Sequence, residues 1–94
     1  MTYARINTIT FTSEEAADKL QTHYASTAPE GFPEAKLLVS VRTGPLTASL
    51  TSIYEDKAAF DRSVEERTRR MAENGHLMDG VVVEEGDVTL FHIK

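Results

Sequence analysis

Apolar and polar residues alternate in four segments of the chain, which is the pattern of half-buried β-strands. Residues 2–12 are rich in Thr, Ile, Tyr and Phe, contain no Gly or Pro, and carry apolar side chains at both odd and even positions. Residues 36–43 and 46–54 alternate on either side of Gly44-Pro45, which predicts an antiparallel hairpin. Residues 81–94 are β-rich but interrupted by a Glu-Gly-Asp turn, and they predict either two short strands or one long strand with a bulge.

Two further segments show the three- and four-residue spacing of amphipathic helices. Thr12-Ser13-Glu14-Glu15 matches a capping box, and the apolar stripe that follows predicts a helix ending near Thr27, before Pro29. Asp56 is placed to cap a second helix over residues 57–74, with its stop at Asn74-Gly75. We expect this second helix to be continuous and to bury its apolar stripe: Ala59, Phe60, Val64 and Met71.

The element order is therefore β-α-β-β-α-β, the α+β ferredoxin-like arrangement, in which two helices cover one face of a four-stranded antiparallel sheet. Residues 1–94 form one domain. We expect Tyr3, Ile9 and Phe11 to lie on the other face of the sheet. Because monomers avoid a large apolar patch in water, this face predicts a homodimer formed through the sheet.

Composition narrows the possible functions. A net charge of −5 disfavours nucleic acid and anionic membranes as partners. The absence of cysteine excludes a disulfide framework and suits a reducing cytoplasm. Apolar runs are too short to span a membrane, and there is no nucleotide-binding loop, hydrolase elbow or zinc-protease motif. We expect no metal and no flavin.

The segment Ser52–Asp61, with the sequence SIYEDKAAFD, resembles the dimeric α/β barrel superfamily, and specifically its antibiotic biosynthesis monooxygenase-like branch. There, a strand commonly runs into a Tyr/Trp-Glu-x-x-x-Ala-Phe helix start. The opening strand and the hairpin are similar as well, so the resemblance covers the whole chain. Its motifs are structural, and they support the fold far more than the chemistry.

The resemblance implies a homodimer with the two sheets facing each other and a pocket in each subunit between sheet and helices. The activities it implies include oxygenation of aromatic or quinol-type substrates without metal or flavin, haem breakdown, and isomerisation of small ring compounds. Asn7, in the context Ile-Asn-x-Ile, resembles a pocket asparagine of these proteins. The haem-degrading pattern fails otherwise, because Ser63 stands where a Trp is used and His76 falls beyond the helix stop.

Asn7 is the first candidate for catalysis, since its amide can hold a substrate carbonyl or stabilise an enolate oxygen. Its alternative role is a satisfied interface amide. Arg5 and Tyr3 share its face of the strand and are candidates for substrate binding. Arg5 can bind a carboxylate or phenolate, or pair with an acid across the dimer. Tyr24 and Tyr54 can each donate a phenol proton to a substrate, although buried tyrosines more often pack.

Three histidines are too far apart in sequence to form a metal motif. His23, beside Tyr24 on the first helix, and His76, after the second helix, are candidates for the catalytic base because imidazole accepts a proton near neutral pH. Each is otherwise an ordinary exposed histidine. His92 alternates with Val88 and Leu90 on the last predicted strand, which indicates a core or interface position.

Two functions remain open. One is a cofactor-independent monooxygenase that acts on a small aromatic or quinol-type substrate. The other is a non-catalytic homodimer that binds a small hydrophobic or aromatic ligand or regulates a partner protein, and the lack of a clustered catalytic set favours it. RNA binding through the related RRM topology lacks its basic and aromatic signature, and an acylphosphatase lacks its phosphate loop.

Overall fold

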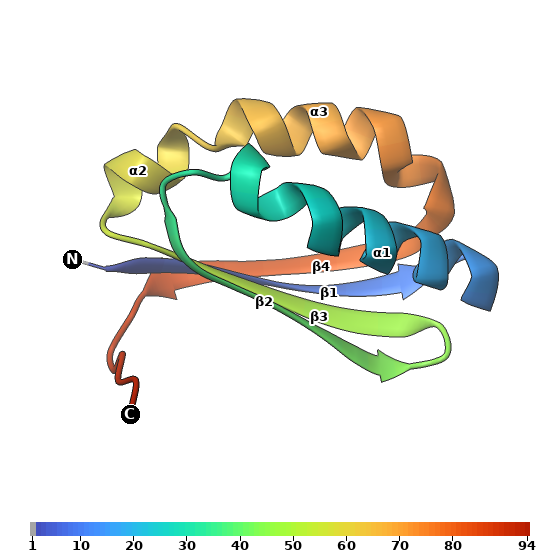
Figure 1. Cartoon of the computed structure of the whole chain (residues 1–94), viewed down its shortest axis with the longest axis horizontal. Coiled ribbons are helices and arrows are strands. Elements are labelled where there is room, and N and C mark those ends of the chain that lie inside the picture. The colour runs from blue at the N-terminus through green and yellow to red at the C-terminus, as the bar shows by residue number, and fades with distance from the viewer. Residues whose placement is uncertain (1) are drawn as a thin grey trace.

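The computed structural model describes residues 2–94 and has the expected β-α-β-β-α-β order (Figure 1). The strands are β1 (Tyr3–Phe11), β2 (Ala35–Gly44), β3 (Thr47–Tyr54) and β4 (Met78–Asp87). The helices are α1 (Glu14–Gly31), α2 (Lys57–Asp61) and α3 (Val64–Asn74), and a 3-10 turn, η1 (Gly75–Leu77), follows α3.

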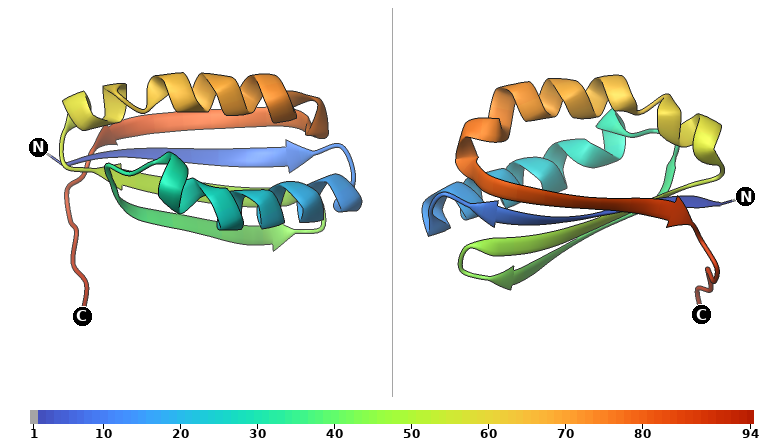
Figure 2. Two further views of the ribbon diagram at one scale, coloured as in Figure 1. Left: turned by 45° about the horizontal axis from the view of Figure 1, so that its top comes forward. Right: turned by 180° about the vertical axis from the view of Figure 1, so that it is seen from behind.

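The four strands form one antiparallel sheet in the order β2-β3-β1-β4. All the helices lie on the same face of this sheet, with α1 over the side of β2 and β3 and α3 over the side of β4 (Figures 1 and 2). This is the ferredoxin-like α+β fold, so the predicted fold class and the predicted hairpin are confirmed.

The helix-covered face of the sheet holds the core. Ile9 and Phe11 are 5% and 1% exposed, and they pack with Ala17 and Leu20 of α1. The prediction that they lie on the open face with Tyr3 is therefore wrong, and the Tyr3 ring instead meets Phe60 of α2 at a centroid distance of 5.0 Å. Large aromatic side chains bury the most area, and the layer beneath the helices is where that area is removed from water.

The opposite face of the sheet carries the even-numbered residues of β1 and their register partners, and no helix covers it (Figure 2). Its apolar side chains alternate with Thr and Ser. They are Ala4, Ile6, Leu37, Val39, Val41, Ile53 and Val82. Ile6 is 45% exposed and Val82 is 64% exposed. An apolar sheet face does exist, as the sequence suggested, but it is built from the other set of residues.

Helix α1 begins one residue later and ends later than the sequence predicts. Ser13 caps it by accepting the Ala16 N–H at 3.0 Å, whereas the Thr12 hydroxyl donates to the Leu77 carbonyl. The helix continues through Pro29 and ends at Gly31, where the Phe32 N–H donates to the Ala28 carbonyl. Proline already has a helical φ, so continuation costs one backbone hydrogen bond on an exposed face.

The second predicted helix is divided in two. The Ser63 N–H and hydroxyl both donate to the Phe60 carbonyl, which turns the chain between α2 and α3. Asp56 caps α2 as predicted, and Phe60 is buried. Val64 and Met71 are 47% and 45% exposed, so their predicted burial is wrong.

The C-terminal segment fits neither predicted alternative. Strand β4 is a single strand that begins already at Met78 and has its irregularity there, opposite Thr10 and Phe11 of β1. After Asp87 the Val88 N–H donates to the Thr2 carbonyl at 2.8 Å, and the chain then leaves the sheet on the side away from the helices (Figure 1). His92 lies in this exposed tail, so its predicted core or interface position on a strand is wrong within this chain.

Within residues 2–94, no helix combines the length and the apolar character that crossing a membrane requires.

We expect Ser13→Ala to lower the free energy of unfolding by about 1 kcal/mol, because it removes the side-chain acceptor at the start of α1. Thr12→Ala is the matched control and should change the free energy of unfolding by less than half as much, since its hydroxyl makes only a 3.4 Å contact. Urea unfolding at one fixed protein concentration measures both. If Thr12→Ala loses more free energy of unfolding than Ser13→Ala, the helix cap is Thr12, as the sequence predicts.

Candidate functional site

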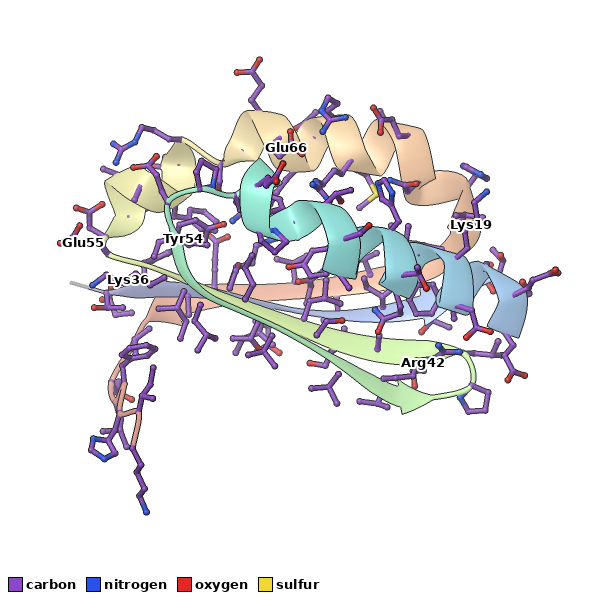
Figure 3. The ribbon with its side chains drawn as sticks, in the orientation of Figure 1. Lys19, Lys36, Arg42, Tyr54, Glu55 and Glu66 are labelled. Carbon is purple, nitrogen blue, oxygen red and sulfur yellow. The ribbon has the colours of Figure 1, made fainter. Side chains whose placement is uncertain are left out.

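A cavity of about 110 Å³ lies between the sheet and the helices. Residues of β1 and β3 line it from the sheet, and residues of α1 and α3 line it from the other side. Five of the residues predicted for the site come together here: Arg5, Asn7, His23, Tyr24 and Tyr54. Figure 3 shows the Tyr54 side chain in the layer between the sheet and the helices.

The other two predicted residues do not line this cavity. Tyr3 packs its ring on Phe60, and its hydroxyl donates to Glu85 at 3.0 Å. His76 lies exposed in η1, beyond α3. Of the two histidines considered as a base, only His23 is at the cavity, and its position on the exposed part of α1 places it at the mouth.

Asn7 is in the middle of β1, between Leu50 of β3 and Val83 of β4. The strand alternation points its side chain toward the helices, where it lines the cavity together with apolar neighbours. Because its face is not the open sheet face, the alternative role of an amide at a sheet-to-sheet interface does not fit its position. An amide in this setting can donate to or accept from a bound oxygen.

Arg5 lines the cavity next to an arginine that the sequence analysis did not identify, Arg67 of α3. The Arg67 Nη2 donates to the Tyr54 hydroxyl at 2.8 Å, while its Nη1 is buried without a hydrogen-bond partner among the described residues. Its guanidinium also lies 4.3 Å from the centre of the Phe60 ring. The only sequence signal for Arg67 is its place seven residues after Phe60, on the face of the predicted helix that carries Phe60, Val64 and Met71.

The charges in the cavity shift the pKa values of two of these groups. Burial lowers the pKa of the Arg5 guanidinium, and the positive charge of Arg67 lowers it further. Burial raises the pKa of the Tyr24 phenol, and the nearby Tyr54 raises it too, against the opposing effect of the arginines. Tyr24 is therefore protonated at neutral pH, and its hydroxyl can donate a hydrogen bond.

The geometry can be compared with that of known proteins. No protein-family model and no curated protein matches the sequence. Among solved structures, the cofactor-independent oxygenase SnoaB from Streptomyces nogalater is similar with a TM-score of 0.79 at 14% identity, over 96% of this chain and 95% of that one. A putative antibiotic biosynthesis monooxygenase from Caulobacter crescentus has a TM-score of 0.75 at 16% identity, over 95% and 91% of the two chains. The chain shares its ferredoxin-like fold with these structures.

A third similar structure is a dimeric ferredoxin-like protein from an uncultured marine organism. Its TM-score is 0.79 at 12% identity, and the match covers 99% of this chain and 92% of that one. At these identities the likeness concerns the fold. The shared fold says nothing of the chemistry, so the side chains in the cavity of this chain must be read from this chain alone.

Arg70 lines the cavity near the end of α1. Its Nε donates to Glu66 at 2.6 Å and its Nη1 to the Thr27 hydroxyl at 3.1 Å, while Nη2 reaches the Thr27 carbonyl. The cation thus stabilises the carbonyl end of α1, whose own last turn has no basic residue. A Cβ on Gly31 would meet the Arg70 Nη2, so a larger residue there would displace this end of the guanidinium.

Glu66 holds Arg70 in place and shares its carboxylate with Arg69 (Figure 3). The i,i+4 spacing of charges in the second predicted helix suggests three ion pairs: Arg62 with Glu66, Glu65 with Arg69, and Glu66 with Arg70. Glu66 does pair with Arg70, whereas Arg62 pairs with Glu34, and Arg69 pairs with Glu66 and Glu73. Over residues 2–94 there is no group of three or more His, Asp and Glu side chains placed to hold a metal ion.

We expect the stability of the protein to depend on pH through Glu66. Hydrogen bonds from Arg69 and Arg70 hold the pKa of this carboxyl below its usual value in the folded protein. Its contribution is therefore complete above the unfolded pKa and is lost as the pH falls through the lower folded pKa. Glu66→Gln should lower the thermal midpoint at pH 7. At pH 3 the variant and the wild type should have similar thermal midpoints.

Glu73→Gln is the control, because Glu73 is 52% exposed and pairs with Arg69 alone. It should change the midpoint little at either pH. Equal effects of the two variants at pH 7 would show that Glu66 contributes no more than an ordinary surface carboxylate.

Proposed function

We propose that this protein is a cofactor-independent monooxygenase that acts on a small aromatic or quinol-type substrate in the cavity. The observation that carries the proposal is the meeting of Asn7, Tyr24 and Arg5 around one largely apolar cavity. Oxygenation without a cofactor needs a base, hydrogen bonds to the developing oxyanion and protection from bulk water. The similarity to SnoaB, described as a cofactor-independent oxygenase, agrees with this chemistry.

The reaction balances with dioxygen as the only oxidant. A phenol with a hydrogen on the carbon opposite its oxygen gives its phenolic proton to a base, and that carbon adds O2. The hydroperoxide formed loses water and leaves a quinone, so one oxygen atom enters the product and the other leaves as water. The substrate supplies all four electrons that reduce O2.

The residues of the cavity have separate tasks in this proposal. Asn7 and the protonated Tyr24 donate hydrogen bonds to the phenolate oxygen as negative charge develops on it. His23, at the mouth, takes the phenolic proton and returns it to the peroxide oxygen, which gives the hydroperoxide. Ile9, Phe11 and Leu50 exclude water around the ring.

The proposal includes a homodimer formed through the open sheet face. Val39 and Val41 are 41% and 49% exposed there, and together with Ile6 and Val82 they place exposed apolar side chains on three strands of this face, with Thr and Ser between them. Burying such a surface is favourable at about 25 cal/mol per Å² of apolar area. The similar structure from the marine organism is described as dimeric. The cytoplasmic location expected from the sequence stays a prediction.

A non-catalytic ligand-binding homodimer is the second candidate. One observation favours it: in the part of the chain that the structure describes, the only imidazole at the cavity is exposed, and no carboxylate lines the cavity to orient it. Such a dimer would bind a small aromatic molecule and consume no oxygen.

Asn7→Ala should lower the rate of oxygen uptake by about 100- to 1,000-fold, because it removes one donor to the oxyanion. The assay is an oxygen electrode with a panel of phenols and quinols. His76→Ala is the matched control and should leave the rate unchanged, since His76 lies outside the cavity. An unchanged rate for a folded Asn7→Ala protein would remove Asn7 from the mechanism, and oxygen uptake by no member of the panel would favour the binding protein.

Replacing Val39 and Val41 together by Asp should convert the dimer to a monomer of 10.4 kDa at micromolar concentration. Light scattering measures the mass. Val64→Asp is the control, because Val64 is equally exposed but lies at the start of α3, where an acidic residue is favourable. A wild-type protein that is monomeric would overturn the proposed assembly.

A further inference from the structure

The cavity is positively charged although the protein as a whole is negative. Arg5, Arg67 and Arg70 all line it, and none of the residues that line it is Asp or Glu. The chain carries a net charge of −5, so this concentration of positive charge is local. A cavity of this kind favours an anion.

Arg70 is already neutralised, but the other two arginines are not. Glu66 and Thr27 occupy the Arg70 guanidinium. Across residues 2–94, by contrast, no carboxylate oxygen lies within 4.0 Å of Arg5 or Arg67. Glu85 is the register neighbour of Arg5 on β4 and lines an outer groove that Arg5 and Arg67 also reach. Its carboxylate accepts the Tyr3 hydroxyl and does not line the cavity, and its charge only partly opposes the lowering of the Arg5 pKa.

Arg67 also has a hydrogen-bond donor without an acceptor. Its Nη1 is buried and unpaired, while Nη2 is fixed on the Tyr54 hydroxyl and the guanidinium plane is held among aromatic rings. A buried donor without a partner is unfavourable in the free protein, and a ligand that accepts from it removes that penalty. Burial and the charge of Arg67 also lower the pKa of Arg5, and a bound anion relieves both effects.

The size and the remaining lining limit the ligand further. The cavity of about 110 Å³ is below the roughly 300–1,000 Å³ of pockets for drug-sized ligands, so a single ring fits better than a fused ring system. Most of the other lining residues are apolar or aromatic. A planar carboxylate matches the forked donors of a guanidinium better than a spherical anion does.

We infer that the ligand of this cavity is a small single-ring aromatic carboxylate whose carboxylate binds Arg5 and Arg67 and whose ring lies against the apolar lining. This inference rests on the proposed function in taking the cavity as the substrate site, and it names the substrate class. In the oxygenation proposed above, the substrate is then a hydroxylated aromatic acid. Its carboxylate is held by the arginines, and its hydroxyl is left for Asn7.

The test compares benzoate with benzamide, which has the same shape and no charge. Titration calorimetry at pH 7 with the full-length wild-type protein should show benzoate binding about 100-fold or more tightly than benzamide. Arg67→Met and Arg5→Met should each reduce this ratio to about 10 or less. Arg62→Met is the matched control and should preserve the ratio, because Arg62 is 59% exposed and pairs with Glu34 outside the cavity.

Three results would overturn the inference. They are equal affinities of the wild type for benzoate and benzamide, equal losses of affinity for both ligands in Arg67→Met, and inorganic phosphate competing as strongly as benzoate.

If Arg67→Met does not fold, Arg67→Lys keeps the charge without the forked geometry and should give an intermediate ratio of benzoate to benzamide affinity. Calorimetry measures binding without turnover. If the protein prefers benzoate but takes up no oxygen, only the proposed oxygenase activity is contradicted. Oxygen uptake with neutral phenols and no benzoate preference contradicts only the carboxylate assignment.

Discussion

The attachment of α3 to the rest of the molecule depends on two cations, Arg70 at the end of α1 and, above all, Arg67 among aromatic rings. None of the residues of α3 is buried, so the helix is not held by a conventional apolar stripe. The Arg67 guanidinium lies 4.3 Å from the ring centre of Phe60, 5.3 Å from that of Tyr54 and 5.7 Å from that of Phe32. These rings belong to α2, to the end of β3 and to the residue that follows α1, so a single group joins four parts of the chain. Contacts of this kind contribute about 0.5–2 kcal/mol each when desolvated.

This polar attachment explains why the fold contains a cavity. Leucine or phenylalanine at the positions of Arg67 and Arg70 would pack downward onto the sheet and fill the space above Asn7 and Leu50. Long guanidinium side chains instead reach sideways to Tyr54 and Thr27, and the space below them stays open. Proteins commonly hold binding groups in arrangements that do not maximise stability. The unpaired Nη1 of Arg67 is such an arrangement.

The sequence predicts where the helices and strands lie better than it predicts which of their faces are buried. Alternation and capping residues located all four strands and the start of α2, because these signals are local. They did not tell which face of β1 the helices cover, since Ile6 and Ile9 are equally apolar and only tertiary packing chooses between them. The break at Ser63 depends on a side-chain bond to the Phe60 carbonyl that any serine in a helix can make or omit.

The same distinction applies to the candidate site. Asn7 and Arg5 were identified because polar residues are unexpected in an apolar strand, and His23 and Tyr24 followed from the helix beside it. Arg67 was missed, since an arginine in a charged helix looks like a solvated residue in the sequence. Only its position opposite Phe32 and Tyr54, which come from distant segments, shows that it is part of the cavity.

The alternation of side chains along β1 places the residues that line the cavity and the residues of the open sheet face at different positions. Each set can therefore change without the other. Odd positions such as Arg5 and Asn7 face the cavity, and even positions such as Ile6 and Thr8 face the open side of the sheet. A substitution at one parity therefore alters recognition while leaving the other surface intact. An insertion of one residue would exchange the two surfaces and destroy both.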